Sequence, residues 1–198
     1  MILYTANPSP FSRMARVVAR ELNLTNRVEE RQVNPWNDPD GLLSANPLGT
    51  IPTLILDDGG VLSDSKLITV YLNDQAGGTL FGTDEQRWAV GNRVYLADGI
   101  LNAGVFLTVS RRRPEEERAP LWMERRSLTI QRTLQVLERE VPALQDPLTM
   151  DQIAVGCALG YLDFRQCVGD WRAIAPTLGA WFGGYAQRPA MVGTAPAD

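Results

Sequence analysis

The sequence has no histidine, one lysine and two cysteines among its 198 residues. Without histidine, a zinc site or a cysteine–histidine nucleophile has few side chains to draw on. Cys157 and Cys167 lie in a stretch with a helical apolar pattern. Small, weakly polar side chains in such a pattern are typical of a protein core. We therefore expect both cysteines to be buried, and we predict no metal site.

The chain also lacks a long apolar run. Its longest apolar stretch, residues 153–162, ends at Asp163 and is about half as long as a membrane-spanning helix requires. At the start of the chain, a short strand-like segment is followed by Pro8 and Pro10, which does not match a signal peptide. The net charge of −4 gives no basic footprint for nucleic acid. We expect a cytoplasmic protein with neither a membrane nor a nucleic-acid partner.

One charged run stands out in this background. Arginines at residues 111–113 are followed by Pro114 and by glutamates at residues 115–117. Basic residues favour the end of a helix and acidic residues favour its start. We therefore interpret the run as a helix end next to a helix start, with charges that compensate each other, in preference to an anion-binding site.

Residues 46–65 hold the most informative pattern. Pro52 stands directly before the apolar residues 53–56, and a proline without an N–H group fits the first position of a strand or a tight turn. The Asp-Asp-Gly-Gly turn at residues 57–60 predicts a hairpin with residues 61–63. Apolar residues at helical spacing then predict a helix over residues 66–75, with Asp64 and Ser65 at its start.

The residues before this hairpin predict a strand–helix–strand unit. Residues 2–5 are β-prone, and the helical spacing begins at Phe11 and is closed by Asn23 and Asn26. Residues 27–33 alternate as a strand does, and a parallel return gives a right-handed βαβ unit. Ser9 then lies in a loop just before a helix. The element order βαβ followed by ββα is the thioredoxin-like order.

After a glycine-rich break at residues 77–84 the sequence predicts only helices. Apolar stripes indicate two long helices, one ending near Arg113 and a second that is capped around residues 114–120. The spacing at residues 149–152 predicts a capping box before an apolar helix that we place at the centre of a bundle. A shorter helix over residues 177–187 follows, and the tail 188–198 is expected to be irregular.

Three motifs in the expected order resemble those of the glutathione S-transferase family. They are Ser-Pro-Phe-Ser-Arg at residues 9–13, Asn-Pro-Leu-Gly with Ile51-Pro52 at residues 46–52, and Asp64-Ser65. The segment 96–100 and the short tail are similar to a small bacterial branch of that family. The resemblance implies a thioredoxin-like domain at residues 1–77, a linker at 78–84 and an all-helical domain at 85–198. It also implies a cis Ile51–Pro52 bond, although local energetics alone favour trans.

The resemblance further implies glutathione as co-substrate and Ser9 as the catalytic residue that stabilises its thiolate. Ser12 is the competing assignment. The glutathione-binding residues would be Phe11, Trp36, Thr50, Ile51, Pro52, Asp64 and Ser65. Core packing is the alternative role for Phe11 and Trp36.

Serine at position 9 favours conjugation over disulfide exchange, because the branches of the family that catalyse thiol–disulfide exchange carry cysteine at this position. The implied function is a cytoplasmic, homodimeric detoxification enzyme that attacks a small electrophile or a peroxide with glutathione. The alternative is a glutathione-binding or regulatory protein of the same fold that does not catalyse a reaction, since fold alone does not decide function.

Overall fold

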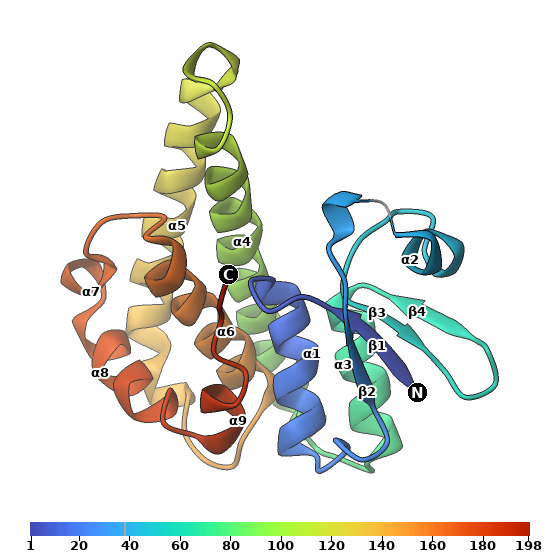
Figure 1. Cartoon of the computed structure of the whole chain (residues 1–198). Coiled ribbons are helices and arrows are strands. Elements are labelled where there is room, and N and C mark those ends of the chain that lie inside the picture. Colours follow the sequence, from blue (N-terminus) through green and yellow to red (C-terminus); the bar gives the residue numbers. More distant parts are fainter. Residues whose placement is uncertain (38) are drawn as a thin grey trace. The chain divides into compact units, whose positions relative to one another are not determined.

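A computed structural model of the protein describes residues 1–37 and 39–198 (Figure 1). The chain divides into two compact units, residues 1–79 with 189–198 (unit 1) and residues 80–188 (unit 2). The domain limits predicted from the sequence stay a prediction. Within the described ranges, no helix is both long enough and apolar enough to cross a membrane.

Unit 1 is built on a four-stranded sheet of order β2-β1-β3-β4. Strands β1 (Ile2–Thr5) and β2 (Glu29–Gln32) are parallel, whereas β3 (Thr53–Ile55) and β4 (Val61–Ser63) form the predicted antiparallel hairpin. Within its first 79 residues this unit has the helices α1 (Pro10–Glu21), α2 (Asp40–Ala45) and α3 (Ser65–Gln75) and the short turn η1 (Pro35–Asn37). This order confirms the predicted thioredoxin-like arrangement.

The core of unit 1 follows from the apolar spacing of the sequence. Leu3 and Leu54, from the two central strands, have no exposed surface. Met14 and Val17 of α1 and Ile68 of α3 are equally buried, and the two helices lie side by side (Figure 1). Burying a side chain of this size contributes about 1.5–3 kcal/mol to folding. This packing holds α1 and α3 against each other in unit 1.

The tail of the chain differs from expectation. Part of the segment predicted to be irregular forms a short helix, α9 (Pro189–Val192), which packs against α1. The buried Arg13 guanidinium donates from one terminal nitrogen to the carbonyl oxygen of Met191 at 3.0 Å and from Nε to Thr194 Oγ1 at 3.4 Å. A four-residue helix carries too little periodicity to be found in a sequence, and its order comes from these tertiary contacts.

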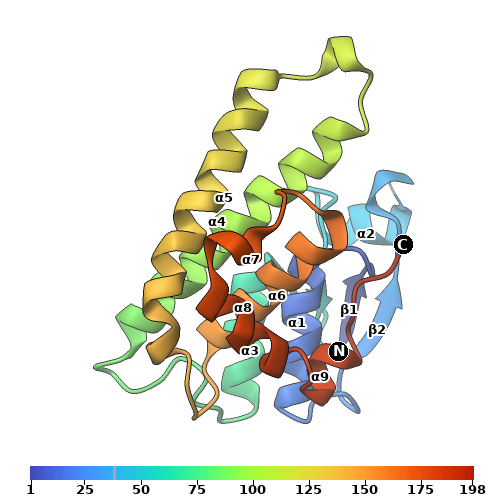
Figure 2. The same cartoon turned by 90° about the vertical axis from the view of Figure 1, so that its left-hand side faces the viewer.

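Unit 2 consists of helices. Its long pair is α4 (Arg87–Arg111) and α5 (Pro120–Glu140), which Figure 2 shows side by side, with the turn η2 (Glu115–Glu117) between them. Helix α6 (Met150–Arg165) is buried along almost all of its length, as expected for the centre of the unit. The turn η3 (Val141–Ala143) and the helices α7 (Trp171–Ile174) and α8 (Pro176–Tyr185) complete the unit.

The start of α6 is not the capping box that its spacing predicts. Thr149 is the N-cap residue, but its side chain accepts no bond from a helix N–H group. Its hydroxyl instead donates to Asp151 Oδ1 at 2.5 Å, and the same oxygen accepts the N–H of Gln152 at 3.1 Å. The Gln152 amide turns back to the carbonyl oxygens of Gln145 and Pro147. Asp151 therefore accepts the Gln152 N–H that a capping box assigns to the Thr149 hydroxyl.

Candidate functional site

The sheet register brings the predicted site residues to one end of the sheet. Tyr4 is paired with Thr53, Thr53 with Ser63, and Thr5 with Gln32. The carboxyl ends of β1, β2 and β4 and the amino end of β3 therefore coincide. The segments attached at this end carry the predicted residues, namely Ser9 and Phe11 after β1, Trp36 after β2, Thr50, Ile51 and Pro52 before β3, and Asp64 and Ser65 after β4.

Ser9 is the N-cap residue of α1. Its hydroxyl oxygen accepts the backbone N–H of Ser12 at 3.2 Å, and its own N–H donates to the Ala6 carbonyl oxygen at 3.1 Å. Because the oxygen is the acceptor in the capping bond, the hydroxyl proton stays available as a donor. The side chain is half-buried, so one side of it can be reached from outside.

Ser12, the competing assignment, lies in a different environment. The residue has no exposed surface, and its hydroxyl has no hydrogen-bond partner in the described part of the chain. A ligand cannot reach a side chain in that position without a rearrangement of α1. Burial therefore favours Ser9 of the two.

The turn before β3 offers an open backbone edge. The Ile51–Pro52 peptide bond is cis, as the resemblance implied. Ile51 is half-buried, and neither its N–H nor its C=O is hydrogen-bonded to a group in residues 1–37 or 39–198. A free N–H and C=O on one residue can pair with an extended peptide, as an added strand does.

Asn46 holds this turn in place, a role that the sequence motif did not reveal. Its side chain is buried, and Nδ2 lies 3.1 Å from the Thr50 carbonyl oxygen and 3.0 Å from Thr53 Oγ1. Its Oδ1 accepts the N–H of Leu48 at 3.0 Å. One amide group thereby ties both ends of the segment that presents Ile51.

Asp64 and Ser65 start α3. Asp64 lies at a φ of 76°, and its Oδ1 accepts the N–H of Lys66 at 2.7 Å, which makes it the N-cap residue. Its Oδ2 lies 3.7 Å from Lys66 Nζ. A positive φ is rare for a residue other than glycine, and such strain is concentrated at functional sites. Ser65, in the first turn, is almost fully buried. The pair places a carboxylate and a helix N-terminus together.

The remaining predicted residues differ in exposure. The Trp36 side chain is 72% exposed, which excludes the core-packing alternative for this residue. Phe11 is half-buried, so its two roles stay open. Thr50 is exposed, and its hydroxyl oxygen accepts from Asn46 Nδ2 at 3.1 Å. Pro52 is buried.

Neither cysteine belongs to this end of the sheet. Cys157 and Cys167 are not joined by a disulfide and are buried in unit 2, as predicted for structural side chains. Burial raises the pKa of the Cys167 thiol and outweighs the opposing hydrogen bond with Thr108. Within the described ranges, no group of three or more histidine, cysteine, aspartate or glutamate side chains could hold a metal ion.

The sheet order, the cis-proline turn and the serine-capped first helix place unit 1 in the thioredoxin-like class of folds. The family model "Glutathione S-transferase, N-terminal domain" matches residues 8–75. The "Uncharacterized GST-like protein YibF" of Escherichia coli is 30% identical over 183 residues, which cover 90% of each chain. This chain therefore belongs to the glutathione S-transferase family.

Solved structures agree with this assignment. A glutathione transferase family member from Pseudomonas fluorescens Pf-5 with bound glutathione is 36% identical, with a TM-score of 0.94, over 100% of this chain and 99% of that chain. A second structure from that organism, with bound S-(propanoic acid)-glutathione, is also 36% identical, with a TM-score of 0.90 and full coverage of both chains.

Proposed function

We propose that the protein is a glutathione transferase that binds reduced glutathione at the end of the unit 1 sheet and activates its thiol for attack on a small electrophile. The observation that carries the proposal is the hydrogen bonding of Ser9. Its oxygen is occupied by the Ser12 N–H at 3.2 Å, whereas its proton is free to be donated. The glutathione and the glutathione thioether in the Pseudomonas fluorescens structures support this choice of ligand.

The thiol of glutathione must lose its proton to become a good nucleophile. A thiol with a pKa of about 8.5 is only slightly ionised at neutral pH. A hydroxyl donor at Ser9, next to the N-terminus of α1, stabilises the thiolate more than the thiol. Lowering the thiol pKa by one unit requires about 1.4 kcal/mol, which one charge-assisted hydrogen bond can supply. Peroxide reduction would start from the same thiolate.

The rest of the peptide would use the neighbouring groups. The free N–H and C=O of Ile51 would pair with the cysteinyl main chain as a short antiparallel strand. The γ-glutamyl carboxylate would bind the Ser65 hydroxyl and the N-terminus of α3. The γ-glutamyl ammonium would pair with Asp64, which shares its charge with Lys66 and with the cap of α3. Phe11, Trp36 and Thr50 would line the thiol and glycyl ends.

Calorimetric titration with reduced glutathione tests the proposal. We expect saturable binding that weakens by about tenfold in Asp64→Ala and in Ser65→Ala, since each change removes a polar contact with a charged group. Asp74→Ala, an exposed aspartate in the last turn of α3, is the matched control and should bind as the unmodified protein does. Failure to bind at millimolar glutathione would refute the proposal. If the protein binds glutathione but turns over no electrophile or peroxide, the result would favour the alternative, a glutathione-binding or regulatory protein that does not catalyse a reaction.

We also propose that two copies associate through α4. Trp88 is 74% exposed and Tyr95 is 71% exposed, and their spacing of two helical turns puts both on one face. Gly91, between them, has open space at its Cβ position. Exposed aromatics at helical spacing are typical of an interface, and a two-fold dimer is the commonest assembly. Sedimentation should give a dimer that Tyr95→Glu converts to a monomer, whereas Leu121→Glu, on α5, should leave the dimer intact.

A further inference from the structure

The first turn of α1 carries a buried arginine in an unfavourable place. Arg13 is 5% exposed, and the first turn of α1 has no acidic residue. Among the described residues, the guanidinium has only neutral acceptors, the Met191 carbonyl oxygen and Thr194 Oγ1. A cation at a helix N-terminus is unfavourable, and burying a charge without a charged partner is costly. Such departures from local rules are expected at functional sites.

Arg13 connects the first turn of α1 with the tail of the chain, residues 189–198, which belongs to the same unit. Among residues 10–13, only Arg13 makes a side-chain hydrogen bond with a described residue outside α1. Thr194 is 1% exposed, and its hydroxyl donates to the Ala190 carbonyl oxygen at 2.7 Å. Figures 1 and 2 show the tail, in red, running beside α1 from α9. The tail therefore offers Arg13 two acceptors in an ordered segment.

The first turn of α1 in its turn holds Ser9. The Arg13 N–H donates to the Ser9 carbonyl oxygen at 3.0 Å, and the Ser12 N–H donates to Ser9 Oγ at 3.2 Å. These bonds set the position of Ser9 relative to the first turn. The Arg13 side chain sets the position of the first turn relative to the tail. A displacement of about 1 Å can lower the rate of an enzyme by about 100-fold, so the tail bears on what the Ser9 hydroxyl can do.

We propose that Arg13 is a positioning residue, which binds the tail at Met191 and Thr194 and thereby holds Ser9 where its hydroxyl donates to the glutathione thiolate. This inference rests on the proposed function of Ser9 and adds the tail to the parts of the chain that the reaction needs. A guanidinium suits the role because it donates to two acceptors in fixed directions, whereas the ammonium of a lysine has no such fork. The effect comes from this geometry and not from the charge at the thiolate.

Two substitutions of Arg13 separate geometry from charge. Arg13→Met removes both bonds to the tail and leaves an apolar side chain of similar length, so the melting temperature should not fall. The pKa of the bound glutathione thiol should rise toward about 8.5, and turnover at pH 7 should fall by about tenfold. Glutathione affinity, measured by calorimetry, should change by less than about twofold, because the other contacts remain. Arg13→Lys keeps the charge but loses the fork, and it should raise the thiol pKa as Arg13→Met does.

Arg16→Met is the matched control, since Arg16 lies on the same helix and is 6% exposed. Its Nε donates to Glu30 Oε2 at 2.7 Å, and it makes no hydrogen bond with a described residue of the tail. Breaking this ion pair should lower the melting temperature. The thiol pKa should stay unchanged, and turnover at pH 7 should change by less than about twofold. A role of Arg13 in folding alone predicts the reverse, with a lower melting temperature and an unchanged thiol pKa in Arg13→Met.

Hydrogen exchange followed by NMR tests the anchor in the protein without glutathione. The reporter is the Ser12 N–H, which is bonded to Ser9 Oγ. In Arg13→Met this N–H should exchange about tenfold faster than in the unmodified protein, because the first turn of α1 opens more often. In Arg16→Met its exchange should change by less than about twofold.

A substitution in the tail tests the same anchor from the other side. Thr194→Val removes the acceptor of the Arg13 Nε bond and should speed the exchange of the Ser12 N–H by about threefold. Thr133→Val, on α5, is the matched control. The Thr133 hydroxyl also donates to a carbonyl oxygen four residues earlier, at 2.8 Å, but no guanidinium donates to it. This control should leave the exchange unchanged.

The positioning role is overturned if Arg13→Met leaves the exchange of the Ser12 N–H unchanged. It is also overturned if Arg13→Lys keeps the thiol pKa that Arg13→Met loses, which would assign the effect to charge. Ser9→Gly is the reference. If Ser9→Gly leaves the thiol pKa unchanged, the proposed function fails, and the exchange of the Ser12 N–H still decides whether the tail holds Ser9. If Ser9→Gly raises the thiol pKa and Arg13→Met does not, the positioning role fails and the proposed function stands.

Discussion

Arg93 on α4 and Asp151 on α6 form a buried ion pair, with 2.5 Å between Nε and Oδ2. Asp151 has no exposed surface, and its other oxygen accepts from Thr149 and from the N–H of Gln152. Arg93 also lies 3.3 Å from Glu140 at the end of α5. One arginine thus links all three long helices of unit 2, and one aspartate fixes where α6 begins.

We predict that Asp151→Asn lowers the free energy of unfolding by about 3 kcal/mol, because it leaves a buried guanidinium without its charged partner. Urea unfolding followed by circular dichroism measures the change. The matched control is Asp84→Asn, since Asp84 is almost fully exposed and lies 3.6 Å from Arg87. An exposed pair of this kind contributes less than about 1 kcal/mol. Equal losses in the two variants would contradict the role assigned to Asp151.

The carboxylate of Glu138 on α5 caps α8. It accepts the backbone N–H groups of Thr177 and Leu178 at 2.9 and 2.7 Å. Burial by itself raises the pKa of Glu138, but the hydrogen bonds from Thr177 and Leu178 outweigh it and hold the pKa below its ordinary value of 4.5. A carboxyl group with a lowered pKa in the folded state stabilises the fold where it is ionised.

We therefore predict that Glu138→Gln destabilises the protein by about 1–2 kcal/mol at pH 7 through loss of the charge at the N-terminus of α8. The contribution is complete above the unfolded pKa and disappears as the pH falls through the folded pKa. The difference between the variant and the unmodified protein should accordingly shrink below pH 4.5. Denaturant melts from pH 3 to pH 7 give the profile. Glu124→Gln, an exposed position on α5, should show no such dependence.

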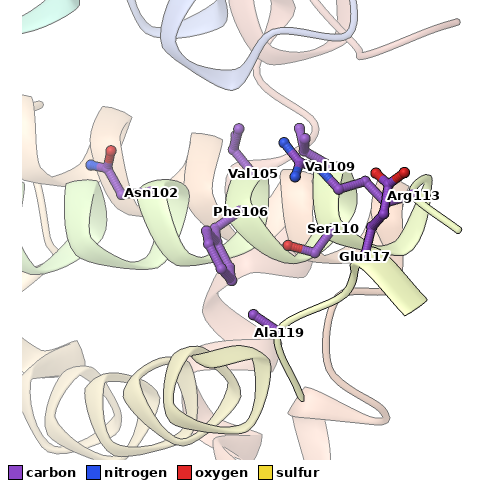
Figure 3. A pocket seen from close by; sticks show the side chains of 8 residues that line it. All are labelled: Asn102, Val105, Phe106, Val109, Ser110, Arg113, Glu117 and Ala119. Atoms are coloured by element: carbon purple, nitrogen blue, oxygen red, sulfur yellow. The ribbon is translucent and has the colours of Figure 1, made fainter. Parts of the chain in front are cut away.

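The spacing of apolar and capping residues predicted the helices and strands well, but it did not predict which side chains form hydrogen bonds and ion pairs within them. The capping box at residues 149–152 was predicted from spacing, yet Asp151 took the central role because Arg93, distant in sequence, holds it. Asn46 was part of a recognised motif, but its side chain makes four polar contacts that depend on the folded turn, and the one with Thr53 exists only once β3 is folded. A cavity lined by Phe106 and Ala119 (Figure 3) had no signal in the sequence, since it joins side chains of α4 to the segment before α5, and the spacing within each segment does not predict how the two meet.

The turn that presents Ile51 gives a third prediction. Asn46→Ala removes the buried amide that holds this turn and should cost about 2 kcal/mol of stability. Asn46→Ala should also weaken glutathione binding more than a surface substitution does. The reason is that the free backbone N–H and C=O of Ile51 are no longer held in position. Asn26→Ala is the matched control, since Asn26 is exposed and lies before the amino end of β2, at the end of the sheet opposite to the predicted site. Unchanged glutathione affinity in Asn46→Ala would argue against a backbone contact at Ile51.

Ser9 combines two roles, and two substitutions separate them. Alanine removes both the cap of α1 and the hydroxyl donor, and loss of a cap costs about 1 kcal/mol. Glycine removes the hydroxyl but serves as an N-cap at a cost of only about a few tenths of a kcal/mol. We predict that Ser9→Ala and Ser9→Gly both lower turnover with glutathione by about tenfold or more at neutral pH, whereas only Ser9→Ala lowers the melting temperature measurably.

The pH dependence of turnover in the Ser9 variants shows whether the lost activity comes from a less ionised glutathione thiol. If Ser9 stabilises the thiolate, the variants must ionise the thiol of bound glutathione at its ordinary pKa of about 8.5, so their turnover should recover as the pH rises through that value. The pKa of the bound thiol can be read from thiolate absorbance in the ultraviolet during a pH titration. Ser12→Ala, at the buried alternative, should match the unmodified protein in this titration. A raised thiol pKa in Ser12→Ala but not in the Ser9 variants would reverse the assignment of the two serines.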